Sequence, residues 1–271
     1  MDIFHSIILG VVQGVTEFLP ISSTGHLILA EKLLALGQGE FLKSFDIIIQ
    51  LGSILAVMVL YWRQFLNWEI LKRLAVAFVP TGILGLALYK IVKTYLLGNE
   101  AVVLWSLLIG GILLVVFEYW HKEKNLPQPL LKEGSCSLPL GRVGEDLNFS
   151  YRHCFYIGLF QSIAMIPGVS RSAATILGGL LLGLKRRTIV EFSFLLAAPT
   201  MLAATGLDLF KSAGQFSVAQ WDFLATGFIA AFLVAIAAIR FFLGFIKKHT
   251  FIPFGVYRIV IAVLFYIYII N

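Results

Sequence analysis

The residues of this chain best suited to chemistry gather in two short polar segments that interrupt long apolar stretches. The first segment, from Pro20 to His26, holds three consecutive hydroxyl side chains, those of Ser22, Ser23 and Thr24. Serine and threonine are typical helix N-caps, so we expect a half-helix to begin here with its free N–H groups directed at the break. Because such N–H groups attract negative charge, the segment is suited to binding an anion.

The second polar segment runs from Pro167 to Ser172 and includes Ser170 and Arg171. We expect another helix N-terminus here. Two N-termini that converge on one cavity, together with an arginine whose planar fork matches phosphate oxygens, would form a receptor for a polyanionic diphosphate. Helix capping alone would account for the serines, but it does not explain an arginine buried in an apolar stretch, so we expect Arg171 to be functional.

A polar helix face precedes the first segment. Gly10, Gln13 and Glu17 are spaced three and four residues apart, so on a helix they share one face, and Gly10 allows a neighbouring helix to approach closely. An ionisable Glu17 inside an apolar stretch is costly and usually faces a cavity or a partner, which indicates a functional role. Gln13 has two open interpretations, because a buried amide can also simply join two helices.

A histidine near the serine pair completes the candidate set. His26 lies about one helical turn after Ser23, within reach of that hydroxyl. A serine beside a base is a candidate nucleophile, and spacing alone favours Ser23 over Ser22. The hypothesis pairs Ser23 as nucleophile with His26 as its base. Two alternatives stay open: His26 activates water directly, or it is a packing residue.

The elements that position these residues must lie in a membrane. Hydrophobic residues make up 59% of the 271 residues, only 13% are charged, and the mean hydropathy is +0.90, which lies outside the range of soluble domains. Several stretches reach the roughly 20 apolar residues that a helix needs to cross a bilayer, and strand-like alternation is absent. We therefore expect an all-α polytopic membrane protein.

Six apolar stretches predict full crossings, whereas two further apolar regions, 3–36 and 153–184, are broken by the polar segments. Non-helical backbone at membrane depth is tolerated only where protein or a cavity covers it, so these two regions are predicted to be re-entrant helical hairpins. The crossings are expected at 45–62, 74–95, 101–120, 191–210, 223–246 and 254–270.

The basic residues are distributed unevenly over this layout. Six crossings place most of them on one side, including Arg63 and the run from Lys185 to Arg187, and this side should be cytoplasmic with both termini outside. We expect the protein to lie in the plasma (inner) membrane. The net charge of +6 then reflects loops held in the cytoplasm, so membrane lipid is an expected partner and nucleic acid is not.

The two halves of the chain, 1–120 and 153–271, resemble each other across a polar linker, 121–152. Each half holds one hairpin and three crossings, an odd number, so the second half must be inverted relative to the first. In an inverted repeat the two broken segments meet near the bilayer midplane and form the site. At a constant offset, Gly10 matches Gly158, Gln13 matches Gln161, and Ser22 matches Ser170.

Two runs also carry a family resemblance: Gln13-Gly-Val-Thr-Glu17-Phe-Leu-Pro-Ile-Ser-Ser-Thr-Gly-His26 and Pro167-Gly-Val-Ser-Arg171-Ser-Ala-Ala-Thr175. They are similar to the two signature motifs of the undecaprenyl-diphosphate phosphatase family, the bacitracin-resistance type, and the likeness extends over essentially the whole chain. The resemblance implies hydrolysis of undecaprenyl diphosphate to the monophosphate, which recycles the lipid carrier for peptidoglycan. It also implies a site open to the periplasm, a divalent cation, and an association with bacitracin resistance.

The resemblance assigns roles by motif position. Glu17 and Gln13 correspond to the acidic pair that holds the cation, expected to be Mg2+ or Ca2+, and Gln13 leaves one fewer carboxylate for it. Ser23 and His26 correspond to the nucleophile and its base, and Arg171 to the diphosphate clamp. The polar central loop is longer than expected for the family. The substrate-binding residues expected beside Arg171 are Ser22, Thr24, Ser170 and Ser172.

A competing function comes from a different class of protein. Inverted repeats with broken helices are above all a transporter design, so a lipid-phosphate flippase, alone or alongside hydrolysis, is the alternative. Phosphate release by purified protein in detergent separates the two, because a transporter alone liberates none. The sequence is silent on oligomeric state, and a homodimer stays open.

Overall fold

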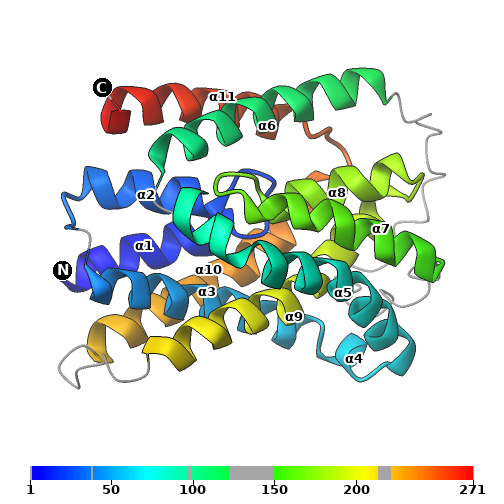
Figure 1. Ribbon diagram of the computed structural model, residues 1–271, viewed down its shortest axis with the longest axis horizontal. Coiled ribbons are helices and arrows are strands. Elements are labelled where there is room, and N and C mark those ends of the chain that lie inside the picture. Colours follow the sequence, from blue (N-terminus) through cyan, green and yellow to red (C-terminus); the bar gives the residue numbers. More distant parts are fainter. Residues whose placement is uncertain (1, 38, 97–98, 122–148, 213–220, 271) are drawn as a thin grey trace, which may run out of the picture.

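The described part of the computed structural model is all helical, as the sequence predicted (Figure 1). Five helices in this part are long and apolar enough to cross a membrane. Most of the predicted polar linker lies outside the residues that the structure describes. These are residues 2–37, 39–96, 99–121, 149–212 and 221–270.

The first half of the chain begins with two short helices and continues with three long ones, with a single-turn helix between the first two of these. The third and fifth helices match predicted crossings but begin several residues earlier. Their first turns contain polar residues, so the hydropathy pattern placed the start of each helix too late. The elements are α1 (Ile3–Thr16), α2 (Ser23–Leu33), α3 (Glu40–Leu60), α4 (Trp62–Phe65), α5 (Trp68–Ile91) with a π-helical turn (Val92–Leu96), and α6 (Glu100–Trp120).

The second half repeats this order without the single-turn helix. Its last helix is the one clear difference from the six predicted crossings, because the apolar helical segment Ile252–Tyr268 is shorter than the other candidate spans. At about 1.5 Å per residue, its 17 residues cover less than the roughly 30 Å of a hydrocarbon core. The elements are α7 (Tyr151–Ser162) with a 3-10 turn (Ile163–Met165), α8 (Arg171–Leu181), α9 (Arg186–Ser212), α10 (Trp221–Phe245), and α11 (Ile252–Phe265) with a π-helical turn (Tyr266–Ile270).

Both broken apolar regions fold as pairs of short helices. Helices α1 and α2 have 14 and 11 residues, and α7 and α8 have 12 and 11, so none is long enough to cross a bilayer alone. The predicted N-caps are confirmed. The Ser22 hydroxyl accepts from the Gly25 N–H at the start of α2, and the Ser170 hydroxyl accepts from the Ala173 N–H at the start of α8.

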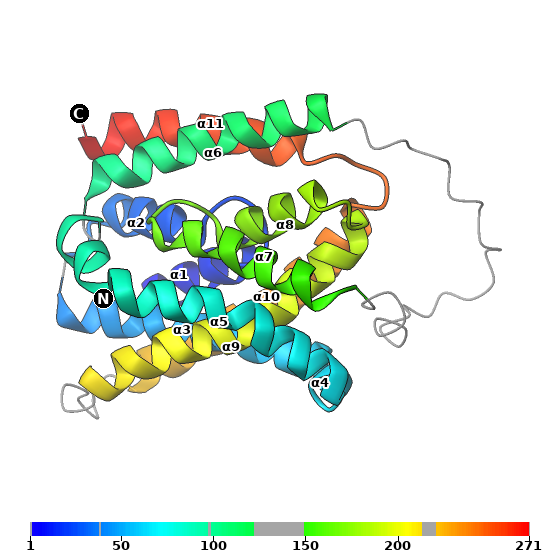
Figure 2. The ribbon, with the colours of Figure 1, turned by 45° about the vertical axis from the view of Figure 1, so that its right-hand side comes forward.

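Each short-helix pair packs on a long helix of the other half. Helix α1 packs along α10 and α7 packs along α5, while α3 meets α9 and α6 meets α11 (Figures 1 and 2). The closest approaches use the matched glycines: a Cβ on Gly10 would collide with the Gly227 carbonyl, and one on Gly158 would collide with the Ala77 carbonyl. The two halves are therefore interleaved rather than stacked side by side.

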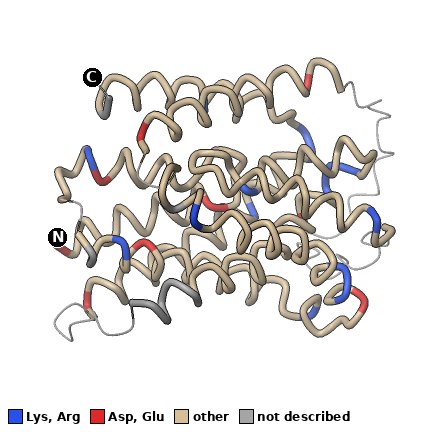
Figure 3. The backbone as a smooth tube through the Cα atoms, in the orientation of Figure 1, with Lys and Arg blue, Asp and Glu red and all other residues tan. Residues whose placement is uncertain are grey.

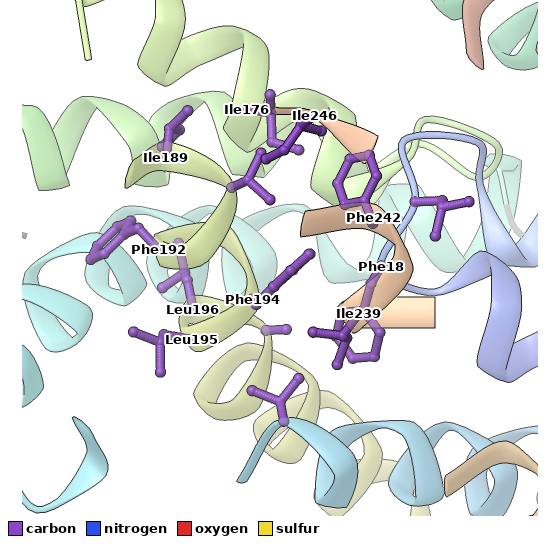
Figure 4. Close-up of a cluster of buried hydrophobic side chains, with 14 of the residues drawn as sticks. Phe18, Ile176, Ile189, Phe192, Phe194, Leu195, Leu196, Ile239, Phe242 and Ile246 are labelled. Atoms are coloured by element: carbon purple, nitrogen blue, oxygen red, sulfur yellow. The ribbon is translucent and has the colours of Figure 1, made fainter. Parts of the chain in front are cut away.

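The two chain termini lie at one end of the molecule, and the end of α6 and the start of α7 lie at the other (Figure 1). Lys and Arg residues gather toward this second end (Figure 3). At the centre, a cluster of buried apolar side chains holds in place the polar segment 20–26, which we call the first break (Figure 4). There Phe18 packs edge-on against Phe194 of α9, with ring centroids 5.4 Å apart. The polar segment 167–172 is the second break.

Candidate active site

The carboxylate of Glu17 is the centre of a buried polar cluster at the meeting point of the two breaks. Its Oε2 accepts hydrogen bonds from Gln13 Nε2 at 2.9 Å and from Ser23 Oγ at 2.8 Å. Its Oε1 accepts from the Arg171 guanidinium at 3.2 Å, across 154 positions of sequence. Glu17 is only 7% exposed. The expectation that charged residues far apart in the sequence lie together is confirmed for Glu17 and Arg171.

Local sequence explains how the first break presents these groups. The i,i+4 spacing of Gln13 and Glu17 places both on one face at the end of α1, and Ser23 is the first residue of α2. Between them, Ser22 has a φ of 73°, a left-handed conformation that is uncommon for a residue with a Cβ. This turn reverses the chain sharply, so that the start of α2 faces the end of α1.

Arg171 is held at the first residue of α8. Its guanidinium donates to the Ser193 carbonyl at 2.8 Å as well as to Glu17, and its Nε is buried without a hydrogen-bond partner. A guanidinium with one unsatisfied N–H beside a carboxylate is poised to take a further acceptor, such as a phosphate oxygen.

The other hydroxyls expected to bind substrate have different surroundings. Ser172 Oγ donates to the Leu19 carbonyl at 2.8 Å and lies 2.9 Å from Ser170 Oγ, so both hydroxyls tie the second break to the backbone of the first. The Ser22 hydroxyl is buried and caps α2. The side chain of Thr24 is exposed. The structure therefore gives three of these four hydroxyls a structural contact.

His26 is close to this cluster but is not bonded to Ser23. Its Nδ1 lies 2.7 Å from the Ser22 carbonyl oxygen, and its Nε2 lies 2.9 Å from the Tyr257 hydroxyl on α11. The Ser23 hydroxyl instead donates to Glu17. The sequence spacing predicted that the His26 imidazole and the Ser23 hydroxyl lie one turn apart, but it could not show that the hydroxyl would donate to Glu17 instead.

Sequence reasoning missed Arg258, the largest fully buried side chain of the described residues. Its guanidinium donates to the carbonyls of Ser106 at 2.8 Å and Gly168 at 3.1 Å, and to that of Pro20 at 3.5 Å. One side chain thus joins α6, the first break and the second break. A charged residue within the apolar stretch 254–270 was the signal that could have found it.

Known proteins are similar to this chain over nearly its full length. A family model described as Bacitracin resistance protein BacA matches residues 6–264. The chain belongs to this family. Among its relatives, a Sulfurihydrogenibium protein is 48% identical over 268 residues, covering 99% of this chain and 100% of the relative. An Aquifex aeolicus protein is 48% identical over 266 residues, covering 98% of each chain, and a Wolinella succinogenes protein is 48% identical over 270 residues, covering 99% of each.

All three relatives carry the name undecaprenyl-diphosphatase. The match to the bacitracin resistance family includes both breaks and every residue of the Glu17 cluster. The family resemblance drawn from the two motifs is thus confirmed.

The donor set of this bacitracin resistance family member fits a divalent cation only in part. The described residues contain no group of three or more His, Cys, Asp or Glu side chains suited to a metal. They do contain one carboxylate, that of Glu17, beside the Gln13 Oε1, a buried oxygen without a hydrogen-bond partner. Mg2+ is commonly held by one or two protein oxygens while water and substrate phosphates supply the rest. The two residues fit a cation that is shared with a phosphate ligand.

Proposed function

We propose that this chain hydrolyses undecaprenyl diphosphate to undecaprenyl phosphate and inorganic phosphate in the bacterial inner membrane. The reaction recycles the lipid carrier of peptidoglycan synthesis and accounts for the family's link to bacitracin resistance. Membership of the family and the names of full-length relatives support the substrate. The single observation that carries the chemistry is the Glu17 carboxylate bonded to both the Ser23 hydroxyl and the Arg171 guanidinium.

The diphosphate binds where the first turns of α2 and α8 meet. Their N–H groups and the Arg171 guanidinium offset its negative charge, and its terminal phosphoryl group lies against Ser23. Phosphoryl transfer depends mainly on such positioning and charge stabilisation. The apolar prenyl chain extends into the surrounding bilayer.

The hydrogen bond from Ser23 to Glu17 favours the carboxylate as the first base. Ser23 Oγ forms a bond to the terminal phosphorus, its proton passes to Glu17, and the bond to the bridging oxygen breaks to release undecaprenyl phosphate. A water molecule then attacks the phosphoserine and gives a proton to His26, the bond from phosphorus to Ser23 Oγ breaks as that oxygen takes the proton from Glu17, and His26 releases its proton to solvent with the inorganic phosphate. His26 thus acts on the water, whereas the hypothesis drawn from the sequence paired it with Ser23 as the base.

A divalent cation, Mg2+ or Ca2+, completes the proposed site. Glu17 and the Gln13 Oε1 would hold it together with the substrate phosphates, and it would supply further charge neutralisation. Whichever of the two cations binds, the hydrogen bond between Ser23 and Glu17 orients the nucleophile toward its base.

We further propose that residues 1–120 and 153–271 form inverted repeats joined by a cytoplasmic linker, 121–152. Support comes from the exchanged packing of α1 on α10 and of α7 on α5, and from the shared end at which both termini lie (Figure 2). The basic end of the molecule then faces the cytoplasm (Figure 3). The site opens to the outer side, where the diphosphate carrier is released.

Purified protein in detergent micelles tests the proposed hydrolysis directly. With undecaprenyl diphosphate and Mg2+, the protein should release inorganic phosphate, and EDTA should suppress the release. The competing function is lipid transport, which the two broken helices at the centre of the molecule favour. A transporter alone needs two compartments and would release no phosphate in micelles, so this result would reject hydrolysis.

A further inference from the structure

His26 is held from both sides by groups of different halves. Its Nδ1 lies 2.7 Å from the Ser22 carbonyl oxygen, and its Nε2 lies 2.9 Å from the hydroxyl of Tyr257 on α11. The two rings are also stacked, with centroids 5.4 Å apart and an interplanar angle of 8°. We propose that Tyr257 relays the proton of the attacking water to His26 in the hydrolysis proposed above, on which this inference rests.

The two contacts determine which nitrogen of His26 carries the proton. A carbonyl oxygen can only accept a hydrogen bond, so the Nδ1 of His26 donates to Ser22. In the neutral ring, Nε2 is therefore the basic nitrogen, and it accepts from the Tyr257 hydroxyl. Because the Tyr257 O–H occupies the single basic lone pair of the ring, a proton from water reaches Nε2 through the phenol: the water donates its proton to the Tyr257 oxygen as the phenol proton passes to Nε2.

The backbone of the first break supports this arrangement at a cost. Ser22 has a φ of 73°, a left-handed conformation that is strained for residues with a Cβ. The same turn directs the Ser22 carbonyl at both the ring and the backbone N–H of His26. Strain of this kind persists at sites where a specific orientation matters.

The neighbour of Tyr257 fixes the position of the phenol. Arg258 is 1% exposed, and its guanidinium binds carbonyls of both breaks, those of Pro20 and Gly168. Helix α11 is thereby attached to the site at the residue next to Tyr257. Tyr257 itself is 41% exposed, so its hydroxyl is not needed to fill the core. A tyrosine at this place serves the imidazole rather than the packing.

Removal of the hydroxyl alone tests the proposal. Tyr257→Phe retains the stacked ring and should lower kcat for phosphate release about tenfold while KM stays within twofold, because the phenol acts on the chemical step through His26. Tyr266→Phe is the matched control, because Tyr266 is exposed on the continuation of the same helix. The control should retain wild-type kcat, and both variants should keep the wild-type thermal unfolding temperature in detergent.

A double-mutant cycle separates a relay through His26 from a general structural role. In a His26→Ala background, assayed with radiolabelled substrate to detect slow hydrolysis, Tyr257→Phe should change the residual rate less than twofold. Equal losses in both backgrounds, or wild-type kcat in the single variant, would overturn the proposal. Neither result touches the proposed function, which fails only if the wild-type protein releases no phosphate in the same assay.

Discussion

The two breaks share a scaffold but supply different chemistry. In each, a serine caps a short helix, Ser22 for α2 and Ser170 for α8. The next residue differs: the first break has the Ser23 hydroxyl, and the second has the Arg171 guanidinium. Both side chains reach Glu17, one to each carboxylate oxygen. The two halves of the chain thus bring the proposed nucleophile and the proposed anion clamp to the same carboxylate.

The comparison also separates hydroxyls that serve chemistry from those that serve structure. Ser23 of the first break bonds to a carboxylate, whereas Ser172 of the second bonds to the Leu19 backbone carbonyl. In the proposed mechanism, the second break contributes charge and structural contacts, and the first contributes the reacting groups. This division leads to variants that should differ in the size and kind of their effects.

The largest effect is expected in the first break. Ser23→Ala and Glu17→Gln should each lower kcat for phosphate release about a thousandfold, because one removes the nucleophile and the other the base. Glu69→Gln, at an exposed carboxylate at the start of α5, is the control and should retain activity. Near-normal turnover by Ser23→Ala would favour direct attack by water and would remove the serine from the mechanism.

A smaller loss is expected when Arg171 is replaced by a residue that keeps the positive charge but lacks the planar guanidinium group. Arg171→Lys should lower kcat/KM about a hundredfold, because a lysine cannot bond to Glu17, the Ser193 carbonyl and a phosphate at once. The measurement is steady-state kinetics in micelles. If the lysine variant matched the wild type, a point charge would be sufficient and the planar geometry would be irrelevant.

The hydroxyl of Ser172 should matter for stability more than for rate. Ser172→Ala removes one of the three hydrogen bonds that the Leu19 carbonyl accepts, the others coming from the Ile21 N–H and the Ser170 hydroxyl, which should lower stability by about 1 kcal/mol. Its kcat/KM should fall less than tenfold, far less than for Ser23→Ala. Thermal unfolding in detergent and phosphate release measure the two effects. A loss as large as that of Ser23→Ala would make the two breaks equivalent in chemistry.

The smallest effect on activity is expected at the interleaved helices. Gly10→Ala and Gly158→Ala should each lower stability by about 1–3 kcal/mol, because the added methyl group meets a carbonyl of the other half. Gly244→Ala is the matched control, since a Cβ there has open space around it. If only one of the two variants were destabilised, the packing of the halves would be less symmetric than the matched glycines suggest.

Much of the site could be predicted from the sequence because its order is local. The i,i+4 spacing of Gln13 and Glu17, the serine caps and the intramembrane Arg171 each follow from short-range rules. The internal match of the two halves then predicted that the breaks would meet. The structure shows the ion pair between Glu17 and Arg171 that this prediction required.

Long-range partners were beyond such rules. Tyr257 is 231 positions from His26, and a tyrosine on an apolar helix is common at membrane interfaces, so nothing marked it. The spacing of Ser23 and His26 fitted a bonded pair, but the turn at Ser22 directs the imidazole toward α11 and the hydroxyl toward Glu17. The prediction of a full crossing at 254–270 rested on apolar composition, but the apolar helical segment there, Ile252–Tyr268, has only 17 residues.

The most direct test of the central claim, that the two halves form one site, is a double-mutant cycle across the ion pair. Phosphate release is measured for Glu17→Ala, Arg171→Ala and the double variant in the same micelles, with residual rates followed by radiolabelled substrate. Because the two residues act as a unit, the double variant should be no slower than the slower single variant by more than about twofold. Losses that multiply would show that the carboxylate and the guanidinium act independently, and the shared site would be rejected.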